Sequence, residues 1–357
     1  MSRAKDSVNQ QVEENNGNMI ATNNGVVYYG MNYTDVRSLC LDLINEVINK
    51  AKQVALIETK KRENELVTKI LEKCANANLK PNDIMRAFEE PALQFDFIEA
   101  EKAYIKYGTD ELKDILSSIV VRRIEEKNHS LLQIALGEAI KTVPLLLKEQ
   151  MNTLALKFVI SHTINLTLNS LQSLREYLYN TIIPIFRSGM SKKESEFQHL
   201  TYSRCATITA FNTQLVSSLS STYSGLFFKG FSEENIPIIE NQKLNTLYPN
   251  LFTSCLNDNS KLQINAINVE DLDKAMKVCN VKDIHKKQIE NLYKIYKMNE
   301  QEIKNKLIEL CPEIEEVIKY WNDTSISRLN LSSVGIIIGA LTTAQITGEA
   351  YELEIWV

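Results

Sequence analysis

The sequence is short of the residues that usually announce chemistry or a disulfide scaffold. Its 357 residues include four histidines, two tryptophans and six cysteines. Metal sites and redox motifs need cysteines or histidines at short spacing, and here the cysteines stand singly and far apart. We therefore expect no metal, no cofactor and no disulfide framework, and the cysteines are predicted to be reduced, buried thiols. They are Cys40, Cys74, Cys205, Cys255, Cys279 and Cys311.

An excess of positive charge is also missing. The formal net charge is −5 and the isoelectric point is near 5.6. Broad nucleic-acid binding needs a basic field over the docking face, so this class of function is not expected. The short basic runs, such as Lys60–Arg62, are typical of solvated helix faces. The polar start of the chain does not resemble a signal peptide, which predicts a cytoplasmic protein.

Long apolar runs able to cross a bilayer are missing too. Two stretches, 205–228 and 329–348, carry no charge. Half of the first is polar, and its apolar residues follow one stripe, which predicts a buried amphipathic helix. The helical part of the second, from Ser332 to Gly348, is about 22 Å long, whereas a bilayer core needs about 30 Å. Gly335 and Gly339 have the spacing of a close helix–helix contact, so we predict core packing and no constitutive membrane insertion.

What the sequence does contain is helical periodicity, with only 11 glycines and 7 prolines to interrupt it. The fold class predicted is all-α, a multi-helix bundle. Thr34 is a good N-cap for a helix whose apolar residues recur in three- and four-residue steps, close to a heptad seam. This stripe runs from Val36 to Val54 and continues, beyond a charged stretch, to Cys74. One helix of roughly 40 residues and two helices broken near Lys60 are equally compatible with the pattern.

The two ends add small β elements to this helical body. Asn24-Gly25 favours a tight hairpin turn between 19–23 and 26–30. Residues 351–357 alternate with period two and predict a short C-terminal strand. Unsatisfied strand edges seek partners, which favours assembly. The domains expected are a disordered start plus hairpin (1–33), a helical body (34–235), an irregular connection (236–268) and a C-terminal helical unit ending in a strand (269–357).

Catalytic candidates are weak. Glu196 and His199 share a helix face, and Glu196 could orient the imidazole of His199 for a nuclease or other hydrolase. A Cys–His pair would also need Cys205 close by, and a single helix would place it on the opposite side. A surface or capping histidine is the better interpretation of His199. His162 lies on a strongly apolar helix and is expected to be a core residue with a satisfied hydrogen bond.

Several segments carry a resemblance. They are the Asn/Gly-rich start ending in Gly30–Arg37, the stretches 131–140 and 197–202, and the ending that joins Ser333-Val-Gly, Ile346-Thr-Gly-Glu and Ile355-Trp356. Together they resemble a family of uncharacterised bacterial proteins over nearly the whole chain. The resemblance implies no assigned reaction and no catalytic residues. Similar Asn/Gly-rich starts precede varied domains in bacterial conflict and anti-phage systems, which is an analogy of context.

These observations favour a non-enzymatic interaction protein that forms a homo-oligomer, as a sensor or effector in anti-phage defence. Its partners would be itself and a phage or host protein. The alternatives are an effector enzyme with a site assembled from scattered residues, and a membrane-perturbing effector that uses 205–228 and 329–348 after rearrangement. The interface expected for the first hypothesis consists of Ile20, Val26, Val27, Tyr28, Tyr29, Tyr33, Val36, Cys40, Leu43 and Val47.

Overall fold

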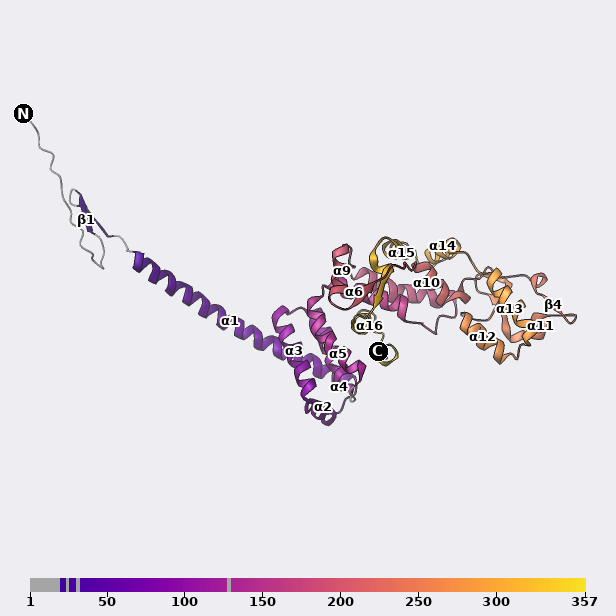
Figure 1. The fold of residues 1–357 in the computed structure, drawn as a ribbon, viewed down its shortest axis with the longest axis horizontal. Helices are drawn as coiled ribbons and strands as arrows, with labels where there is room; N and C mark the ends of the chain where they lie inside the picture. Colours follow the sequence, from indigo (N-terminus) through magenta and orange to yellow (C-terminus); the bar gives the residue numbers. More distant parts are fainter. Residues whose placement is uncertain (1–19, 24–25, 30–32, 127–129, 267) are drawn as a thin grey trace, which may run out of the picture. The chain divides into compact units, whose positions relative to one another are not determined.

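Helices make up most of the chain, as the sequence predicts. The computed structural model describes residues 20–23, 26–29, 33–126, 130–266 and 268–357 (Figure 1). The chain divides into two compact units, residues 1–62 and residues 63–357. The division falls inside α1, a single uninterrupted helix that spans Tyr33–Asn76. At about 1.5 Å per residue, its 44 residues measure about 66 Å. Of the two alternatives left open by the sequence, the structure has the single helix.

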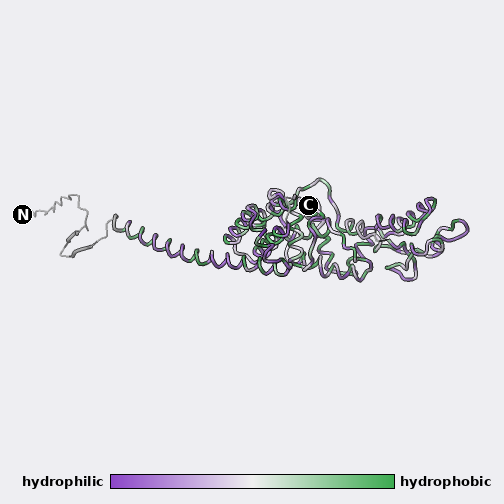
Figure 2. Tube along the Cα trace, turned by 90° about the horizontal axis from the view of Figure 1, so that it is seen from below, coloured by the Kyte–Doolittle hydropathy of each residue, from purple (hydrophilic) through white to green (hydrophobic). Residues whose placement is uncertain are grey.

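The first unit holds β1 (Ile20–Asn23), β2 (Val26–Tyr29) and the N-terminal part of α1. The two strands pair antiparallel, with Ile20 opposite Tyr29 and Asn23 opposite Val26. The predicted turn residues Asn24 and Gly25, and the predicted disordered start, lie outside the described residues. Figure 2 shows hydrophobic and hydrophilic residues alternating along the helical tube that follows.

The second unit is built from short helices and three strand pairs. Its helices are α2 (Pro81–Phe88), α3 (Pro91–Tyr107), α4 (Asp110–Glu125), α5 (Leu131–Thr142), α6 (Lys148–His162), α7 (Leu171–Tyr177), α8 (Ile183–Arg187), α9 (Glu194–Tyr202), α10 (Leu215–Thr222), α11 (Leu244–Leu247), α12 (Val269–Val278), α13 (Asp283–Ile295), α14 (Glu300–Leu310), α15 (Ile314–Asp323) and α16 (Ser333–Thr347). Its strand pairs, all antiparallel, are β3 (Ala206–Ile208) with β8 (Leu329–Leu331), β4 (Ile238–Ile239) with β5 (Gln242–Lys243), and β6 (Phe252–Cys255) with β7 (Asp258–Ile264).

The uncharged helix α16 lies in the core of this unit. Ser332 caps it, its Oγ accepting a hydrogen bond from the Gly335 amide at 3.2 Å, and Gly348 ends it with a left-handed φ of 79°. A Cβ added to Gly339 would lie 2.7 Å from the carbonyl oxygen of Leu154 on α6. The predicted close helix contact is therefore present, and it is a contact within the core. No helix in the described ranges has the length and hydropathy required to cross a bilayer.

Two hydrophobic clusters form inside the second unit. The larger one gathers side chains from the end of α1, from α3 to α10 and from α14 to α16, with Leu66, Phe158 and Ile337 all fully buried. The smaller one surrounds Phe228 and Ile289 and takes in β4 to β7 and α11 to α13. The stretch 236–268, expected to be irregular, thus contains short strand pairs that have a core of their own.

Two local predictions are wrong. Residues 205–228 do not form one helix, because Ala206–Ile208 pairs with the distant strand β8 and the helix α10 starts only at Leu215. The predicted C-terminal strand is instead a single 3₁₀ turn, Leu353–Ile355. Leu353 is buried there, and the indole Nε1 of Trp356 donates to the carbonyl oxygen of His162 at 2.7 Å. These docking contacts hold the segment on α6 without a strand partner among the described residues.

Candidate functional site

The N-terminal part of α1 exposes an apolar surface. Val47 is 65 % exposed, Val54 67 % and Ile57 70 %. We call the exposed apolar residues on one side of this segment the α1 face: Val36, Leu39, Cys40, Leu41, Leu43, Ile44, Val47, Ile48, Val54 and Ile57. Leu56 is also exposed, at 60 %, but it lies on the opposite side of the helix. The α1 face includes the predicted interface residues Val36, Cys40, Leu43 and Val47. An exposed run of this kind is uncommon in a monomer, because contiguous apolar patches usually mark interaction sites.

The α1 face is wider than that of an ordinary amphipathic helix. At 100° per residue, its members cover an arc of about 200°, whereas a helix that packs one side on a core shows about 100°. The remaining arc includes the polar residues Ser38, Asn45 and Asn49 and one apolar residue, Leu56. Two seams of three- and four-residue steps run along the face. One contains Cys40, Leu43, Val47, Val54 and Ile57, and the other contains Leu41, Ile44 and Ile48.

The other predicted interface residues belong to the strands and to the start of α1. Ile20 lies on β1, Val26, Val27, Tyr28 and Tyr29 form β2, and Tyr33 is the first residue of α1. Their side chains lie outside the described part of the structure, so their place in an interface stays a prediction.

The weak catalytic suspects serve other roles. Glu196 Oε2 accepts from the amides of Lys192 at 2.8 Å and Lys193 at 3.4 Å, so this carboxylate caps the start of α9. His199 Nδ1 lies 3.0 Å from Gln150 Nε2 and 3.2 Å from Gln150 Oε1. The imidazole of His199 is thus held by an amide, and the structure does not pair it with Glu196.

Cys205 does not complete a nucleophilic pair. Its side chain is fully buried, and its thiol lies 3.6 Å from the carbonyl oxygen of Ser203, to which it donates. Burial raises the pKa of this thiol to about 12. A neutral thiol at this depth is a poor nucleophile. Among the described residues, no group of three or more potential metal ligands comes together.

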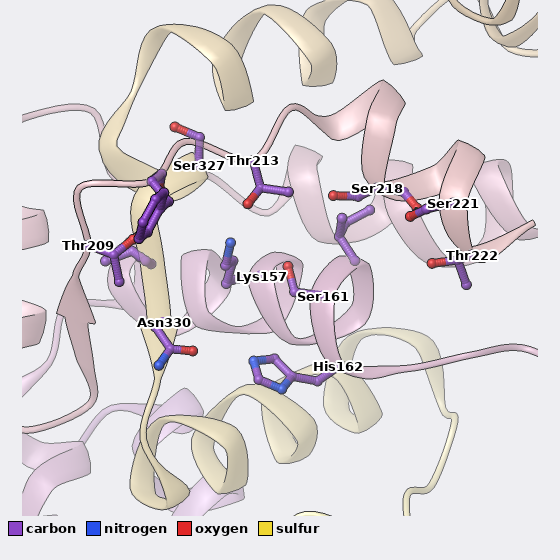
Figure 3. Close-up of a pocket in the computed structure, with 13 residues that line it drawn as sticks. Lys157, Ser161, His162, Thr209, Thr213, Ser218, Ser221, Thr222, Ser327 and Asn330 are labelled. Atoms are coloured by element: carbon purple, nitrogen blue, oxygen red, sulfur yellow. Dashed lines mark hydrogen bonds between the residues drawn. The ribbon is translucent and has the colours of Figure 1, made fainter. Parts of the chain in front are cut away.

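A polar cavity of about 380 Å³ lies between α6, α10 and the β3–β8 pair. Lys157 of α6 lies at its base (Figure 3). This lysine is only 4 % exposed, and its Nζ sits 4.7 Å from the centre of the buried Trp321 ring. Burial lowers the pKa of Lys157 to about 8. Within the described part of the chain, no carboxylate forms an ion pair with this ammonium and none lines the cavity.

Hydrogen-bonding groups surround this ammonium. In Figure 3 the hydroxyls of Ser161, Thr213 and Ser218 point into the same space as the Lys157 amine. The backbone of the loop that carries Thr213 is fixed, because its carbonyl oxygen accepts from Trp321 Nε1 at 2.6 Å and its amide donates to Ser327 O at 3.1 Å. These two bonds use the backbone of Thr213 and leave its hydroxyl for a ligand.

His162 closes one side of the cavity. Its ring stacks on Phe158 with centres 6.4 Å apart, and burial, with the nearby positive charge of Lys157, lowers its pKa. The sequence places Lys157 and His162 on one apolar helix, but it gives no sign that these two residues line a cavity. The opposite wall of the cavity begins at Thr209, 47 residues after His162, so no local pattern could have identified the site.

Comparison with known proteins identifies a family. The model of an uncharacterised protein family matches residues 30–357, nearly the whole chain, and the chain belongs to that family. No curated protein and no solved structure matches it.

Proposed function

We propose that this member of the family is an interaction protein that self-assembles through the α1 face. The observation that supports the proposal is the apolar arc of about 200° on residues 36–57, exposed to solvent in its own unit. A single helical neighbour covers only one of its two seams. Two neighbours cover both, as in a bundle of helices contributed by several copies of the chain.

The charges along α1 favour antiparallel neighbours. Residues 36–49 carry the carboxylates Asp42 and Glu46 and one guanidinium, Arg37. Residues 50–62 carry four lysines and Arg62 against a single carboxylate, Glu58. A parallel pair would align these cationic segments with each other. An antiparallel pair places each of them beside the more acidic half of its partner, which is the favourable arrangement.

The spacing of the first seam, which runs from Cys40 to Ile57, is compatible with an antiparallel partner helix. An antiparallel partner that brings Leu43 opposite Val54 also brings Cys40 opposite Ile57. A closed ring in which every helix has two antiparallel neighbours needs an even number of chains. The smallest such assembly is a tetramer.

Light scattering over a dilution series tests the assembly. The full chain has a mass of 40.7 kDa, so a tetramer gives about 160 kDa. Val47→Glu buries a charge in the interface and should produce monomers. Asn49→Glu adds the same charge on the polar arc and should leave the oligomer intact. A monomeric wild-type chain at micromolar concentration, or equal masses for the two variants, would refute the proposal. A chain that lacks residues 1–32 separately tests the contribution of β1 and β2.

Disulfide trapping tests the direction. Cys40 is exposed, whereas Cys74, Cys205, Cys255 and Cys311 are buried. In a Cys279→Ser background, Ile57→Cys should link Cys40 of one chain to residue 57 of another under mild oxidation. The two positions are about 25 Å apart on one helix, so they cannot link within a chain. Rapid Cys40–Cys40 linkage without the new cysteine would indicate parallel helices. Leu56→Cys, away from the first seam, is the matched control.

The setting we propose for this assembly is defence against bacteriophage, as a sensor or effector. This step rests on the resemblance of the Asn/Gly-rich start to those found in conflict systems. Plaque assays on bacteria that express the chain test it. Protection by the wild type and by Asn49→Glu, with loss of protection for Val47→Glu, would support a defence role that depends on assembly. Equal plating on all strains, over a range of phages, would count against it.

A further inference from the structure

The cavity around Lys157 has the features of an anion site. Lys157 is only 4 % exposed, yet its ammonium has no carboxylate partner among the described residues. A buried charge without a partner is costly, and natural proteins retain such groups where a ligand neutralises them. The hydroxyls of Ser161, Thr213 and Ser218 take part in no side-chain hydrogen bond within the described ranges, so they can all donate to one ligand.

We propose that this cavity binds a small organic phosphate, specifically a nucleoside monophosphate. Lysine serves as a point charge for phosphate, and serine and threonine hydroxyls are frequent donors to phosphate oxygens. The three hydroxyls and the ammonium come from α6, α10 and the loop before α10. They can therefore approach a tetrahedral group from different directions. A volume of about 380 Å³ exceeds what an inorganic ion needs and falls in the range of organic ligands.

Phe211 supplies a surface for the base. It lines the same cavity and is 83 % exposed. The loop is anchored on both sides of this residue, by the Thr209 amide donating to Arg328 O at 2.9 Å and by the Thr213 amide donating to Ser327 O. An exposed aromatic ring on a fixed loop is a stacking platform for a nucleobase. Inorganic phosphate would leave this ring unused.

Tryptophan fluorescence of the full chain offers a direct measurement. Both tryptophans of the sequence lie beside the cavity: Trp321 contacts Lys157, and Trp356 Nε1 donates to the carbonyl oxygen of His162. We expect AMP, or another of the four ribonucleoside monophosphates, to change the emission excited at 295 nm in a saturable way. Calorimetry then gives the dissociation constant. Ribose 5-phosphate, inorganic phosphate and adenosine separate the contributions of phosphate and base.

Three variants assign the contacts. Lys157→Met should weaken nucleotide binding roughly ten- to hundredfold, the loss expected for one charged hydrogen bond. Thr213→Val, which keeps the shape of the side chain, should weaken AMP and ribose 5-phosphate alike. Phe211→Ala should weaken AMP and leave ribose 5-phosphate unchanged. Lys229→Met, far from the cavity, is the matched control and should bind as the wild type does.

Other results would overturn the proposal. Saturating calorimetry with no heat and no fluorescence change at millimolar nucleotide would exclude the site. Adenosine binding as tightly as AMP, with Lys157→Met unaffected, would exclude a phosphate subsite. If Phe211→Ala changed nothing and inorganic phosphate bound as tightly as AMP, the site would be one for a simple anion. Circular dichroism of each variant establishes that it is folded.

Discussion

Replacing Lys157 by methionine should stabilise the free protein near neutral pH. The ammonium is buried without a carboxylate partner in the described part of the chain, and burial lowers its pKa to about 8 from an ordinary 10.5. Methionine has a similar length, carries no charge, and makes favourable contacts with an aromatic ring such as Trp321. The substitution therefore removes a charge that the fold holds at a cost, while it fills the same space.

The size of the effect follows from the pKa. The difference between 10.5 and about 8, at about 1.4 kcal/mol per pH unit, corresponds to about 3 kcal/mol. This energy is the net cost of the charge in the folded chain, so the contact with the indole of Trp321 is already part of it. We expect the variant to gain about 3 kcal/mol at pH 7. Because the unfolded chain binds more protons than the folded chain between about pH 8 and 10.5, wild-type stability should rise through that window. The advantage of the variant should then disappear.

Urea unfolding at a series of pH values measures the difference in stability between the Lys157→Met variant and the wild type. Comparing the two chains at the same pH cancels the shared groups that Lys157 does not touch. The charge of Lys157 helps to lower the pKa of His162, so the comparison is made at pH 7 and above, where His162 contributes least. Lys229→Met is the control, because Lys229 is paired with Glu302 at 2.8 Å on the surface and should change stability by less than about 1 kcal/mol. A gain that does not vary with pH, or a loss of more than 1 kcal/mol at pH 7, would refute the reasoning.

Three further outcomes concern the helical unit. Arg123→Met should cost about 1–3 kcal/mol in urea unfolding, because it leaves the half-buried carboxylate of Asp96, 3.0 Å from Arg123 Nε, without its partner. That loss should shrink at acid pH, where Asp96, whose pKa burial already raises, takes up a proton. Gly339→Ala should lower the melting temperature by at least the equivalent of about 2 kcal/mol, since its Cβ would lie 2.7 Å from a main-chain oxygen of α6. A chain without residues 1–62 should melt near the wild-type temperature by circular dichroism. One without residues 1–76 should not, because it also loses buried side chains of α1.

The parts of the fold that could be predicted are those with local signals. Thr109 precedes two carboxylates, a local helix-start pattern, and its Oγ1 caps α4 by accepting from the Leu112 amide at 3.3 Å. Ser332 and Gly348 similarly mark the two ends of α16. Each of these residues acts within one turn of its own position, so the sequence around it contains the whole interaction.

The predictions that failed depend on distant partners. Ala206 and its neighbours form a strand because Leu329–Leu331 lies alongside, more than a hundred residues later. The alternation at 351–357 satisfies a strand pattern, but Trp356 finds a carbonyl oxygen on α6, and a turn results. A period-two pattern records which side chains are apolar and does not identify what they will contact.

The same distinction separates the two candidate sites. The α1 face is visible in the sequence, since an apolar arc needs only the spacing of one helix. The sequence does not identify Lys157 as a buried residue, because a lysine in an amphipathic helix usually lies on the polar side with its ammonium in water. Its burial depends on Trp321 and on the loop around Thr213, which the fold brings to α6 from other parts of the chain.

At both sites the chain departs from a rule that it follows elsewhere. One rule is that apolar side chains are buried, and the other is that buried charges are paired. Within α1, Leu66 and Ile70 are buried, whereas Val47 and Val54, on the same kind of stripe, are exposed. Around α6 almost every side chain is apolar or hydrogen-bonded, whereas Lys157 holds a charge without a carboxylate partner among the described residues. Both departures lower the stability or solubility of the isolated chain. Such costs persist where something outside the chain removes them. The proposals made above assign that part to a second copy of the chain for the α1 face and to an anion for the cavity.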